Sequence, residues 1–328
     1  MVQRLNNVDD RRDRARQLGR DLAGGRGVDH GIPFCRYFLL GTYYHHDSNV
    51  AAQSPKNWSS EVIVITGATG NIGRSLVQAL VTAGEPATAV SRKEAAFPAG
   101  VRHQRTDFTE PGSLDLTGAK ALFLVPPGGW YDAAGILEAA RANGVRRVVL
   151  VSSQGVGTKR HPAILEQAVQ DSGLEWTVLR PSGFHSNTFA WSQSVREQRL
   201  VEAPFGDISL PAIDPGDIAD VAATALCDPG HAGKTWELTG PAPISPRQQS
   251  QVIAAALGEP VRFAELSREE ARVRLLRFMP EHVADSTLGI LGSPTAAEQQ
   301  VSADVERVLG RPARPYADWV ARNIAAFR

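Results

Sequence analysis

Three glycines at regular spacing stand in the stretch VIVITGATGNIG (62–73). They follow a run of apolar residues that is typical of a buried strand, and they precede a helical pattern. In such a loop the first glycine permits a tight turn, the second lets the backbone approach a pyrophosphate, and the third lets the helix pack closely on the strand. Free N–H groups and the dipole at the helix start attract the anion. The residues that we expect around a bound dinucleotide are Gly67, Thr69, Gly70, Asn71, Ile72 and Gly73.

The residues after the next apolar run, ATAV (87–90), bear on which dinucleotide would bind. A carboxylate at this position would accept hydrogen bonds from the ribose hydroxyls of NAD and would repel the 2′-phosphate of NADP. Here the sequence has Ser91, Arg92 and Lys93, and a guanidinium can hold a phosphate with two parallel hydrogen bonds. We therefore expect NADP(H) as the cofactor. NAD(H) is the less favoured alternative, which stays open because Glu94 follows directly.

The elements that position these motifs alternate between apolar, strand-like runs and amphipathic helical stretches from residue 61 onward. One helix is expected from the glycine loop to about residue 83, and another over 132–143. Near-continuous apolar strands joined by helices form parallel sheets that are covered on both faces. The predicted fold is therefore an α/β, doubly wound parallel sheet of the Rossmann type. The strands are expected at 62–66, 87–90, 101–106, 121–125, 148–153 and 176–179.

After the sixth predicted strand the connections lengthen, and helical patterns dominate to the C-terminus. Asp217 is a candidate N-cap for the helix IADVAATAL, and TWEL (235–238) is typical of a further strand. Capping-box patterns at Ser245–Gln248 and Ser267–Glu270 predict two more helix starts. This part of the chain is expected to be a smaller, mostly helical subdomain on the substrate side.

These patterns divide the chain into three parts. Residues 1–60 are charged and glycine-rich, and we expect a mobile or loosely docked N-terminal extension. Residues 61–185 form the predicted NAD(P)-binding domain, and residues 186–328 form the substrate-side subdomain. The arginines of the extension could suggest nucleic-acid binding. Four aspartates lie among them within the first 21 residues, however, so a phosphate-binding face is not favoured.

Composition indicates a protein with a small partner in a reducing compartment. The 328 residues are 42% hydrophobic, and the 35 basic residues balance the 35 acidic ones. Nothing global therefore favours nucleic acid or membrane surfaces. Cys35 and Cys227 are far apart and lack metal-ligand spacing. Because neither a signal-peptide core nor a run of about eighteen apolar residues occurs, we expect a cytoplasmic location.

Several motifs, read in order, resemble the NmrA-like, atypical short-chain dehydrogenase/reductase family. They are TGATGNIG, SRK, TDF, VVLVSSQGV, SGLEWTVLRPSGF and DPGDIADVAATAL. The likeness covers residues 61–328 and extends to NAD(P)H:quinone oxidoreductases, other bacterial NAD(P)H-binding members and ergot-alkaloid-type dehydrogenases. It implies a Rossmann fold that binds NAD(P)H.

The resemblance also implies where the remaining cofactor contacts fall. Asp107 and Phe108 would lie beside the adenine, Ser152 and Ser153 would face the nicotinamide, and residues 181–184 would close over it. Independently of family, ligands of open parallel sheets bind outside the carboxyl ends of the strands, where these residues fall. The full set of contacts that the resemblance implies is Asp107, Phe108, Val125, Pro126, Pro127, Ser152, Ser153, Pro181 and Phe184.

The chain departs from the family pattern at the proton donor. Typical short-chain reductases use Tyr-x-x-x-Lys, in which the lysine lowers the tyrosine pKa so that the hydroxyl can protonate a nascent alkoxide. The corresponding positions here are Thr158 and Pro162, and none of the five tyrosines has a lysine four residues later. Reduction of an ordinary ketone should then lose about a hundredfold or more in rate. A quinone yields a delocalised phenolate and an iminium yields a neutral amine, so neither acceptor needs a strong acid.

Two functions remain open on this basis. An oxidoreductase would transfer hydride from NADPH to a small electron acceptor such as a quinone or an iminium. A redox sensor resembling NmrA would instead bind oxidised and reduced dinucleotide differently and signal to a protein partner. Aromatic residues that could line a pocket for a flat acceptor favour the reductase, although ordinary core packing is an equal alternative for them. The predicted pocket residues are Trp130, Tyr131, Phe184, His185 and Phe189.

Catalytic candidates are few. His161 could relay a proton, and Ser153 stands at the predicted nicotinamide end of the site. The alternative for His161 is a surface histidine beside Pro162. No metal is predicted, since the histidines of the extension have no partner ligand at useful spacing.

Overall fold

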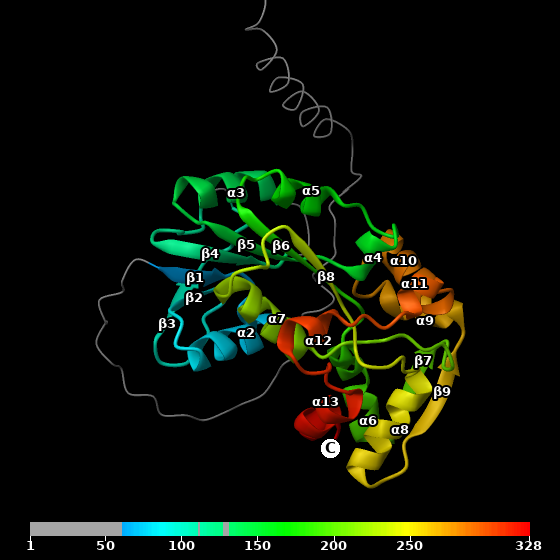
Figure 1. The fold of residues 1–328 in the computed structure, drawn as a ribbon. Coiled ribbons are helices and arrows are strands. Elements are labelled where there is room, and N and C mark those ends of the chain that lie inside the picture. The colour runs from blue at the N-terminus through cyan, green and yellow to red at the C-terminus, as the bar shows by residue number, and fades with distance from the viewer. Residues whose placement is uncertain (1–60, 111, 127–130) are drawn as a thin grey trace, which may run out of the picture. The chain divides into compact units, whose positions relative to one another are not determined.

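Seven parallel strands organise the part of the chain that the structure describes. The computed structural model describes residues 61–110, 112–126 and 131–328. The strands are β1 (Val62–Ile65), β2 (Ala87–Ser91), β3 (Val101–Arg105), β4 (Ala119–Leu124), β5 (Arg147–Val151), β6 (Glu175–Pro181) and β8 (Lys234–Leu238). Their order is β3-β2-β1-β4-β5-β6-β8, and each neighbouring pair is parallel (Figure 1). The predicted doubly wound sheet is confirmed.

Helices cover both faces of this sheet (Figure 1). One face carries α2 (Asn71–Thr82) and α7 (Pro215–Cys227), which pack against each other. The other face carries α3 (Ala133–Ala142) and α5 (Ile164–Gln170). The short helix α4 (Gln154–Gly157) follows β5. The helices predicted after the glycine loop and over 132–143 are thus confirmed.

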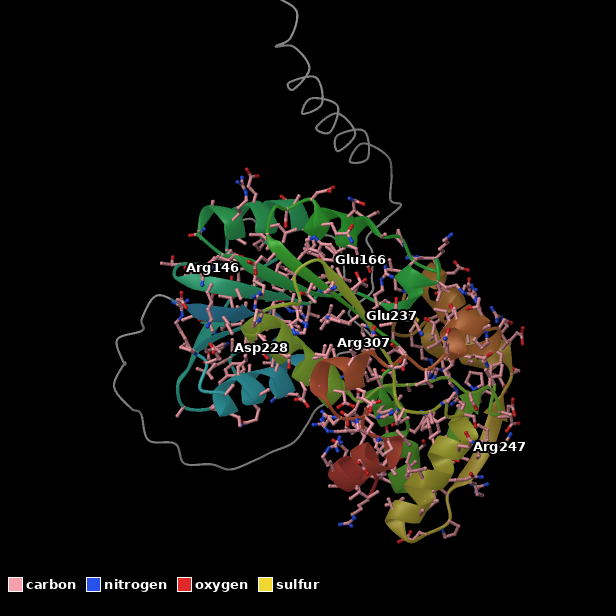
Figure 2. The ribbon with its side chains drawn as sticks, in the orientation of Figure 1. Arg146, Glu166, Asp228, Glu237, Arg247 and Arg307 are labelled. Carbon is pink, nitrogen blue, oxygen red and sulfur yellow. The ribbon has the colours of Figure 1, made fainter. Side chains whose placement is uncertain are left out.

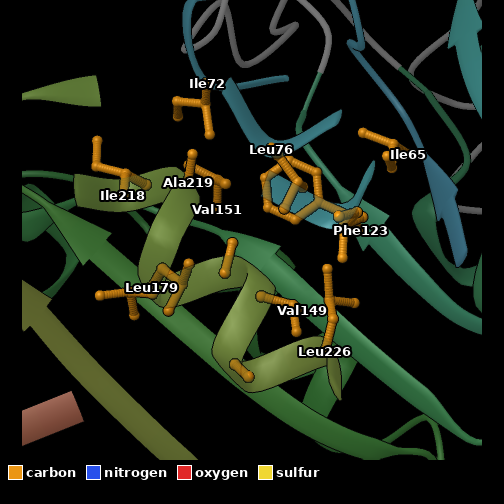
Figure 3. Close-up of a cluster of buried hydrophobic side chains, with 14 of the residues drawn as sticks. Ile65, Ile72, Leu76, Phe123, Val149, Val151, Leu179, Ile218, Ala219 and Leu226 are labelled. Carbon is orange, nitrogen blue, oxygen red and sulfur yellow. The ribbon is translucent and has the colours of Figure 1, made fainter. Parts of the chain in front are cut away.

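Apolar residues at helical spacing build the core beneath α2 and α7. Ile72 and Leu76 of α2 meet Ile218 and Leu226 of α7 in one buried cluster (Figure 3). Burying a side chain of this size stabilises the fold by about 1.5–3 kcal/mol. The strand residues that close this cluster include Ile65, Phe123, Val149, Val151 and Leu179. The strand ends that carry the candidate site are therefore held by a closely packed interior.

The C-terminal region is mostly helical, as predicted, but it also contains a small sheet that the sequence did not indicate. In this sheet β7 (Leu200–Pro204) pairs in parallel with β9 (Arg262–Leu266). The remaining helices are η2 (His185–Trp191), α6 (Ser192–Gln198), α8 (Pro246–Leu257), α9 (Arg268–Leu275), α10 (Glu281–Gly292), α11 (Ala296–Gln299), α12 (Asp304–Leu309), α13 (Tyr316–Asn323) and η3 (Ile324–Phe327). The capping boxes predicted at the starts of α8 and α9 are both present.

The predicted N-cap of α7 was wrong. The helix starts earlier because Pro215 occupies its first turn, and Asp214 is the residue whose carboxylate accepts from the N–H of Gly216, at 2.8 Å. Asp217 lies within the first turn and is fully buried. Its carboxylate accepts a hydrogen bond from the guanidinium of Arg314 at 2.8 Å. Asp217 therefore anchors the C-terminal segment to α7.

The predicted division of the chain stays a prediction. The described residues all fall within one compact unit of the chain. The extension predicted over 1–60 lies outside the described residues. In the described ranges, no helix is long and apolar enough to cross a membrane.

Candidate functional site

The carboxyl ends of neighbouring strands meet at one edge of the sheet. The register aligns Ile65 of β1 with Ala89 of β2 and with Phe123 of β4, and it aligns Val151 of β5 with Leu179 of β6. The strand order reverses beside β1, and open α/β sheets bind ligands at such a switch point. The described residues of the predicted cofactor site lie at the carboxyl ends of β1 to β6 or within eight positions after them. The fold thus brings the predicted residues to one edge.

The glycine loop joins β1 to α2 with little free space. Gly67 has a φ of +64°, a conformation that favours glycine. A Cβ added at Gly73 would lie only 2.2 Å from the carbonyl oxygen of Gly67, so helix and turn touch backbone to backbone. Gly70 is the N-cap residue of α2 and has no side chain with which to cap it. The first N–H groups of α2 are therefore suited to bind an anion such as a pyrophosphate.

Two side chains tie this loop to its surroundings. The Thr66 hydroxyl donates to the carbonyl of Phe123 at 3.0 Å and accepts from the N–H of Val125 at 2.9 Å, which joins the ends of β1 and β4. The Asn71 amide donates to the Ser186 hydroxyl of η2 at 3.1 Å. Sequence reasoning missed Thr66. Its signal was a hydroxyl residue directly between an apolar strand and the first glycine.

The end of β2 carries the residues predicted to choose between dinucleotides. Ser91 is buried and donates to the carbonyl of Lys93 at 2.7 Å, which shapes the turn. Arg92 and Lys93 are exposed. The Glu94 carboxylate pairs with Nδ1 of His103 at 3.3 Å. Glu94, which left the choice between NADP and NAD open, therefore has His103 as a partner, whereas the side chains of Arg92 and Lys93 are exposed to solvent.

The predicted adenine contacts follow β3. The Asp107 carboxylate accepts from the N–H and the hydroxyl of Thr109 at 3.1 and 2.8 Å, which forms a local turn. Phe108 is buried and meets the Tyr131 ring edge to face, with centroids 6.3 Å apart. The half-buried Pro126 precedes residues 127–130, which lie outside the described residues and include the predicted contacts Pro127 and Trp130.

Ser152, at the end of β5, belongs to a network that sequence reasoning missed. Its hydroxyl donates to the carboxylate of Glu166 on α5 at 2.5 Å. Arg180 on β6 donates to both oxygens of that carboxylate, at 3.0 and 2.7 Å, and also to Glu237 on β8 at 3.1 Å. The hydrogen bond to Glu166 raises the pKa of Arg180 above its ordinary value, and burial raises the pKa of Glu237. Glu166 and Glu237 are labelled in Figure 2.

A second buried carboxylate holds the segment that follows. Glu298 of α11 accepts from the Thr158 hydroxyl at 3.0 Å and from two guanidinium nitrogens of Arg160 at 3.0 and 3.2 Å. Burial raises the pKa of Glu298, but these hydrogen bonds outweigh it and keep the pKa below its usual range. Ser153 caps α4, since its hydroxyl accepts from the N–H of Gly155 at 3.0 Å. Thr158 stands at the position of the family's tyrosine, and its hydroxyl donates to the carboxylate of Glu298.

His161 is positioned by packing. A Cβ added at Gly155 would lie 2.0 Å from Nδ1 of His161, so the ring rests on the backbone of α4. Its Nε2 lies 3.5 Å from the hydroxyl of Ser286 on α10. Burial lowers the pKa of His161 to about 4. The ring is therefore neutral near pH 7, and its role as a proton relay stays a prediction.

Aromatic residues of η2 pack into the C-terminal region. Phe189 lies 4.8 Å from Trp319 and stacks on Phe327 at 6.2 Å, ring centroid to centroid. Trp191 also packs against the buried cluster that contains Trp319 and Phe327. This arrangement matches the core-packing alternative for Phe189.

His185 lies in the same region. It is buried, and its ring meets the edges or faces of Tyr316 at 5.1 Å and Trp319 at 6.5 Å. Burial lowers the pKa of His185 to about 4. Pro181 and Phe184 are also buried just before it. In the described ranges, no group of three or more metal-ligating side chains is assembled.

Comparison with known proteins agrees with this arrangement. The model of the NAD(P)H-binding family matches residues 67–229. A (4-alkanoyl-5-oxo-2,5-dihydrofuran-3-yl)methyl phosphate reductase of Streptomyces griseus is 36% identical over an alignment of 280 residues, and the alignment covers 81% of this chain and 99% of that protein. An NAD(P)H azoreductase of Xenophilus azovorans is 32% identical over an alignment of 285 residues, which also covers 81% of this chain and 99% of the relative.

Solved structures share the fold. An NADPH-dependent quinone oxidoreductase of Escherichia coli has a TM-score of 0.65 at 24% identity, and a triphenylmethane reductase of Citrobacter sp. has a TM-score of 0.67 at 23% identity. Each alignment covers 80% of this chain and 99% of the other. The NAD(P)H-binding family that the motifs predicted is confirmed, and the chain belongs to it.

Proposed function

We propose that the chain is an NADPH-dependent oxidoreductase that transfers hydride to a small electrophilic acceptor, such as a quinone or an iminium, without a dedicated acid. The assignment as an NAD(P)H-dependent oxidoreductase rests on two relatives that are named as reductases and that align with this chain over nearly their whole length. The finer proposal rests on the hydrogen-bond direction of two hydroxyls, Ser152 directly after β5 and Thr158 directly after α4. The hydroxyl protons of Ser152 and Thr158 are both donated to buried carboxylates. Neither hydroxyl is poised to protonate an alkoxide.

The residues of this chain fit a bound dinucleotide. Gly73 leaves room for the close approach of helix and turn, and the uncapped start of α2 suits the pyrophosphate. The exposed Arg92 and Lys93 suit a 2′-phosphate. When bound, NADPH supplies the hydride, and the chain binds the cofactor, orients the acceptor and excludes water. The proposed location is the cytoplasm.

Acceptors that accommodate the new electron pair themselves should therefore be substrates. We expect turnover with a naphthoquinone and with a cyclic iminium, and little or none with an unactivated ketone. Relatives that bear the names azoreductase and triphenylmethane reductase support adding an azo dye and a triphenylmethane dye to the panel.

The test is an acceptor panel with purified protein, read as oxidation of NADPH by absorbance, with NADH in parallel. The matched control is Gly73→Ala, which should lose turnover with every acceptor because it disturbs the loop. Ketone reduction at a rate comparable to quinone reduction would contradict the proposal. Absence of turnover with all acceptors, together with different affinities for NADP⁺ and NADPH, would favour the redox sensor instead.

A further inference from the structure

The environment of Ser152 determines to which group its hydroxyl donates a hydrogen bond. Glu166 is only 3% exposed and pairs with Arg180 through two hydrogen bonds. An ionised carboxylate has no proton to donate. In the 2.5 Å contact between them, Ser152 must therefore be the donor. Its oxygen keeps only lone pairs for any further partner.

We propose that Glu166 and Arg180 hold Ser152 as a hydrogen-bond acceptor at the nicotinamide end of the site, where it selects a bound group that carries an N–H or O–H donor. This inference rests on the proposed function and on the placement of Ser152 beside the nicotinamide that the family resemblance implies. Ser152 is then a specificity-determining residue, and Glu166 and Arg180 are positioning residues that act through it. The carboxamide N–H of the nicotinamide is one donor of this kind, and a hydroxyl of the acceptor is another.

Several contacts keep the pair in this arrangement. Ser152 is fixed by its own N–H, which donates to the carbonyl of Leu179 at 2.7 Å. Arg180 is held from its far side by Glu237. A Cβ added at Gly157 of α4 would lie 2.7 Å from a Glu237 oxygen, so the helix after Ser152 rests on the network as well. The hydroxyl therefore has little freedom to turn its proton toward a ligand.

The chain contains a matched control. Glu298 is 2% exposed and accepts two hydrogen bonds from Arg160 and one from the Thr158 hydroxyl. Glu298→Gln therefore breaks a buried pair of the same composition without touching Ser152. A general loss of packing or charge would affect both variants, whereas the proposed role is confined to Glu166.

The decisive measurement compares the dissociation constants of NADP⁺ and of its 3-acetylpyridine analogue, which keeps the carbonyl and lacks the N–H donor. A hydrogen bond polarised by a carboxylate should give the wild type about a tenfold preference for NADP⁺. Ser152→Ala and Glu166→Gln should each remove most of this preference for NADP⁺. The double variant should lose no more of the preference than either single variant. Ser152→Thr and Glu298→Gln should keep it.

A second arm covers a donor on the acceptor. It compares KM for a hydroxynaphthoquinone with KM for the parent naphthoquinone in the same variants. A change of either ratio in Ser152→Ala and Glu166→Gln, but not in Glu298→Gln, supports the inference and identifies the source of the donor. Unchanged ratios in both arms would overturn it and leave the proposed function standing.

Two further outcomes are distinguishable. If Glu166→Gln does not fold, Arg180→Lys keeps the charge and removes the two-pronged contact, and it should lower the same ratio. A ratio unchanged in Arg180→Lys would count against the inference. If the wild type binds neither dinucleotide, the proposed function fails and the inference fails with it.

Discussion

Replacing Gly73 with alanine would test whether the loop is built around close backbone contact. The added Cβ would lie 2.2 Å from the carbonyl oxygen of Gly67 and 2.7 Å from the Cα of Ala68. Real Cβ atoms essentially never approach closer than 3.0 Å, so the first contact must open by at least 3.0 − 2.2 = 0.8 Å. Both obstacles are backbone atoms, and no side chain can rotate away. The start of α2 must therefore separate from the turn that it follows.

The expected cost has two parts. Overpacking of this kind costs about 1–3 kcal/mol, and the higher helix propensity of alanine offsets at most about 1 kcal/mol of it. Subtracting the full offset leaves an expected net loss of up to about 2 kcal/mol in the free energy of unfolding. The displaced N–H groups would also lose at least one hydrogen bond to a charged phosphate, which corresponds to NADPH affinity about tenfold to a hundredfold weaker.

Urea unfolding gives the first quantity, and a fluorescence titration with NADPH gives the second. The control is Gly289→Ala in α10, where an added Cβ meets nothing within 4 Å. That variant should be as stable as the wild type or slightly more so, with unchanged NADPH affinity. If Gly73→Ala bound NADPH as tightly as the wild type, the assignment of this loop as the pyrophosphate site would be refuted.

Two further variants test charge at separate points. In calorimetry the wild type should bind NADPH at least about tenfold more tightly than NADH. Arg92→Ala should remove most of that difference in affinity, whereas Arg146→Ala, at the opposite sheet edge, should keep it. Equal wild-type affinities for NADPH and NADH would defeat the NADP assignment. Burial lowers the pKa of His185 to about 4 from 6.5, so the unfolded chain takes up the proton first. Stability is therefore complete above about pH 6.5 and falls toward pH 4, by about 2 kcal/mol at pH 5. Urea midpoints at pH 7 and pH 5 should differ less in His185→Gln, and an equal difference would count against this account.

The sheet and its first helices could be predicted because their signals are local. A run such as VIVI, buried on both faces, has no polar alternation, which is typical of a strand in a covered parallel sheet. The glycine spacing likewise requires a particular turn wherever it follows a strand. Such patterns need no knowledge of distant partners.

The small sheet escaped prediction because its pairing is not local. β7 and β9 are short, and Leu200 pairs with Arg262 across more than sixty residues of intervening chain. The α7 cap was ambiguous for a different reason. Asp214 and Asp217 both stand before apolar helical residues, and only the proline at 215 indicates that the earlier one begins the helix.

The carboxylate networks were hidden for a third reason, although one signal was available. Glu166 falls between Leu165 and Val169, on the face of α5 that packs toward the core. A carboxylate at such a position needs a cationic partner, since burying it alone is costly. Arg180 is likewise a charged residue within the otherwise apolar strand WTVLRP, so it also needs a partner of opposite charge. The sequence could have shown that each needed a partner, but not that Ser152 would share it.

The direction of the Ser152 hydrogen bond and the net charge of the surrounding network both favour the proposed reaction. The network has two carboxylates, Glu166 and Glu237, against the single guanidinium of Arg180, a formal excess of one negative charge. A fixed negative excess stabilises positive charge beside it, and positive charge develops on the nicotinamide ring as hydride leaves. Glu166 retains the proton of Ser152, and Glu298 retains that of Thr158, whereas a ketone reductase would have to release such a proton. The proposed reaction, in which hydride leaves the nicotinamide and the acceptor itself accommodates the electrons that it receives, is the one that a site of this polarity suits.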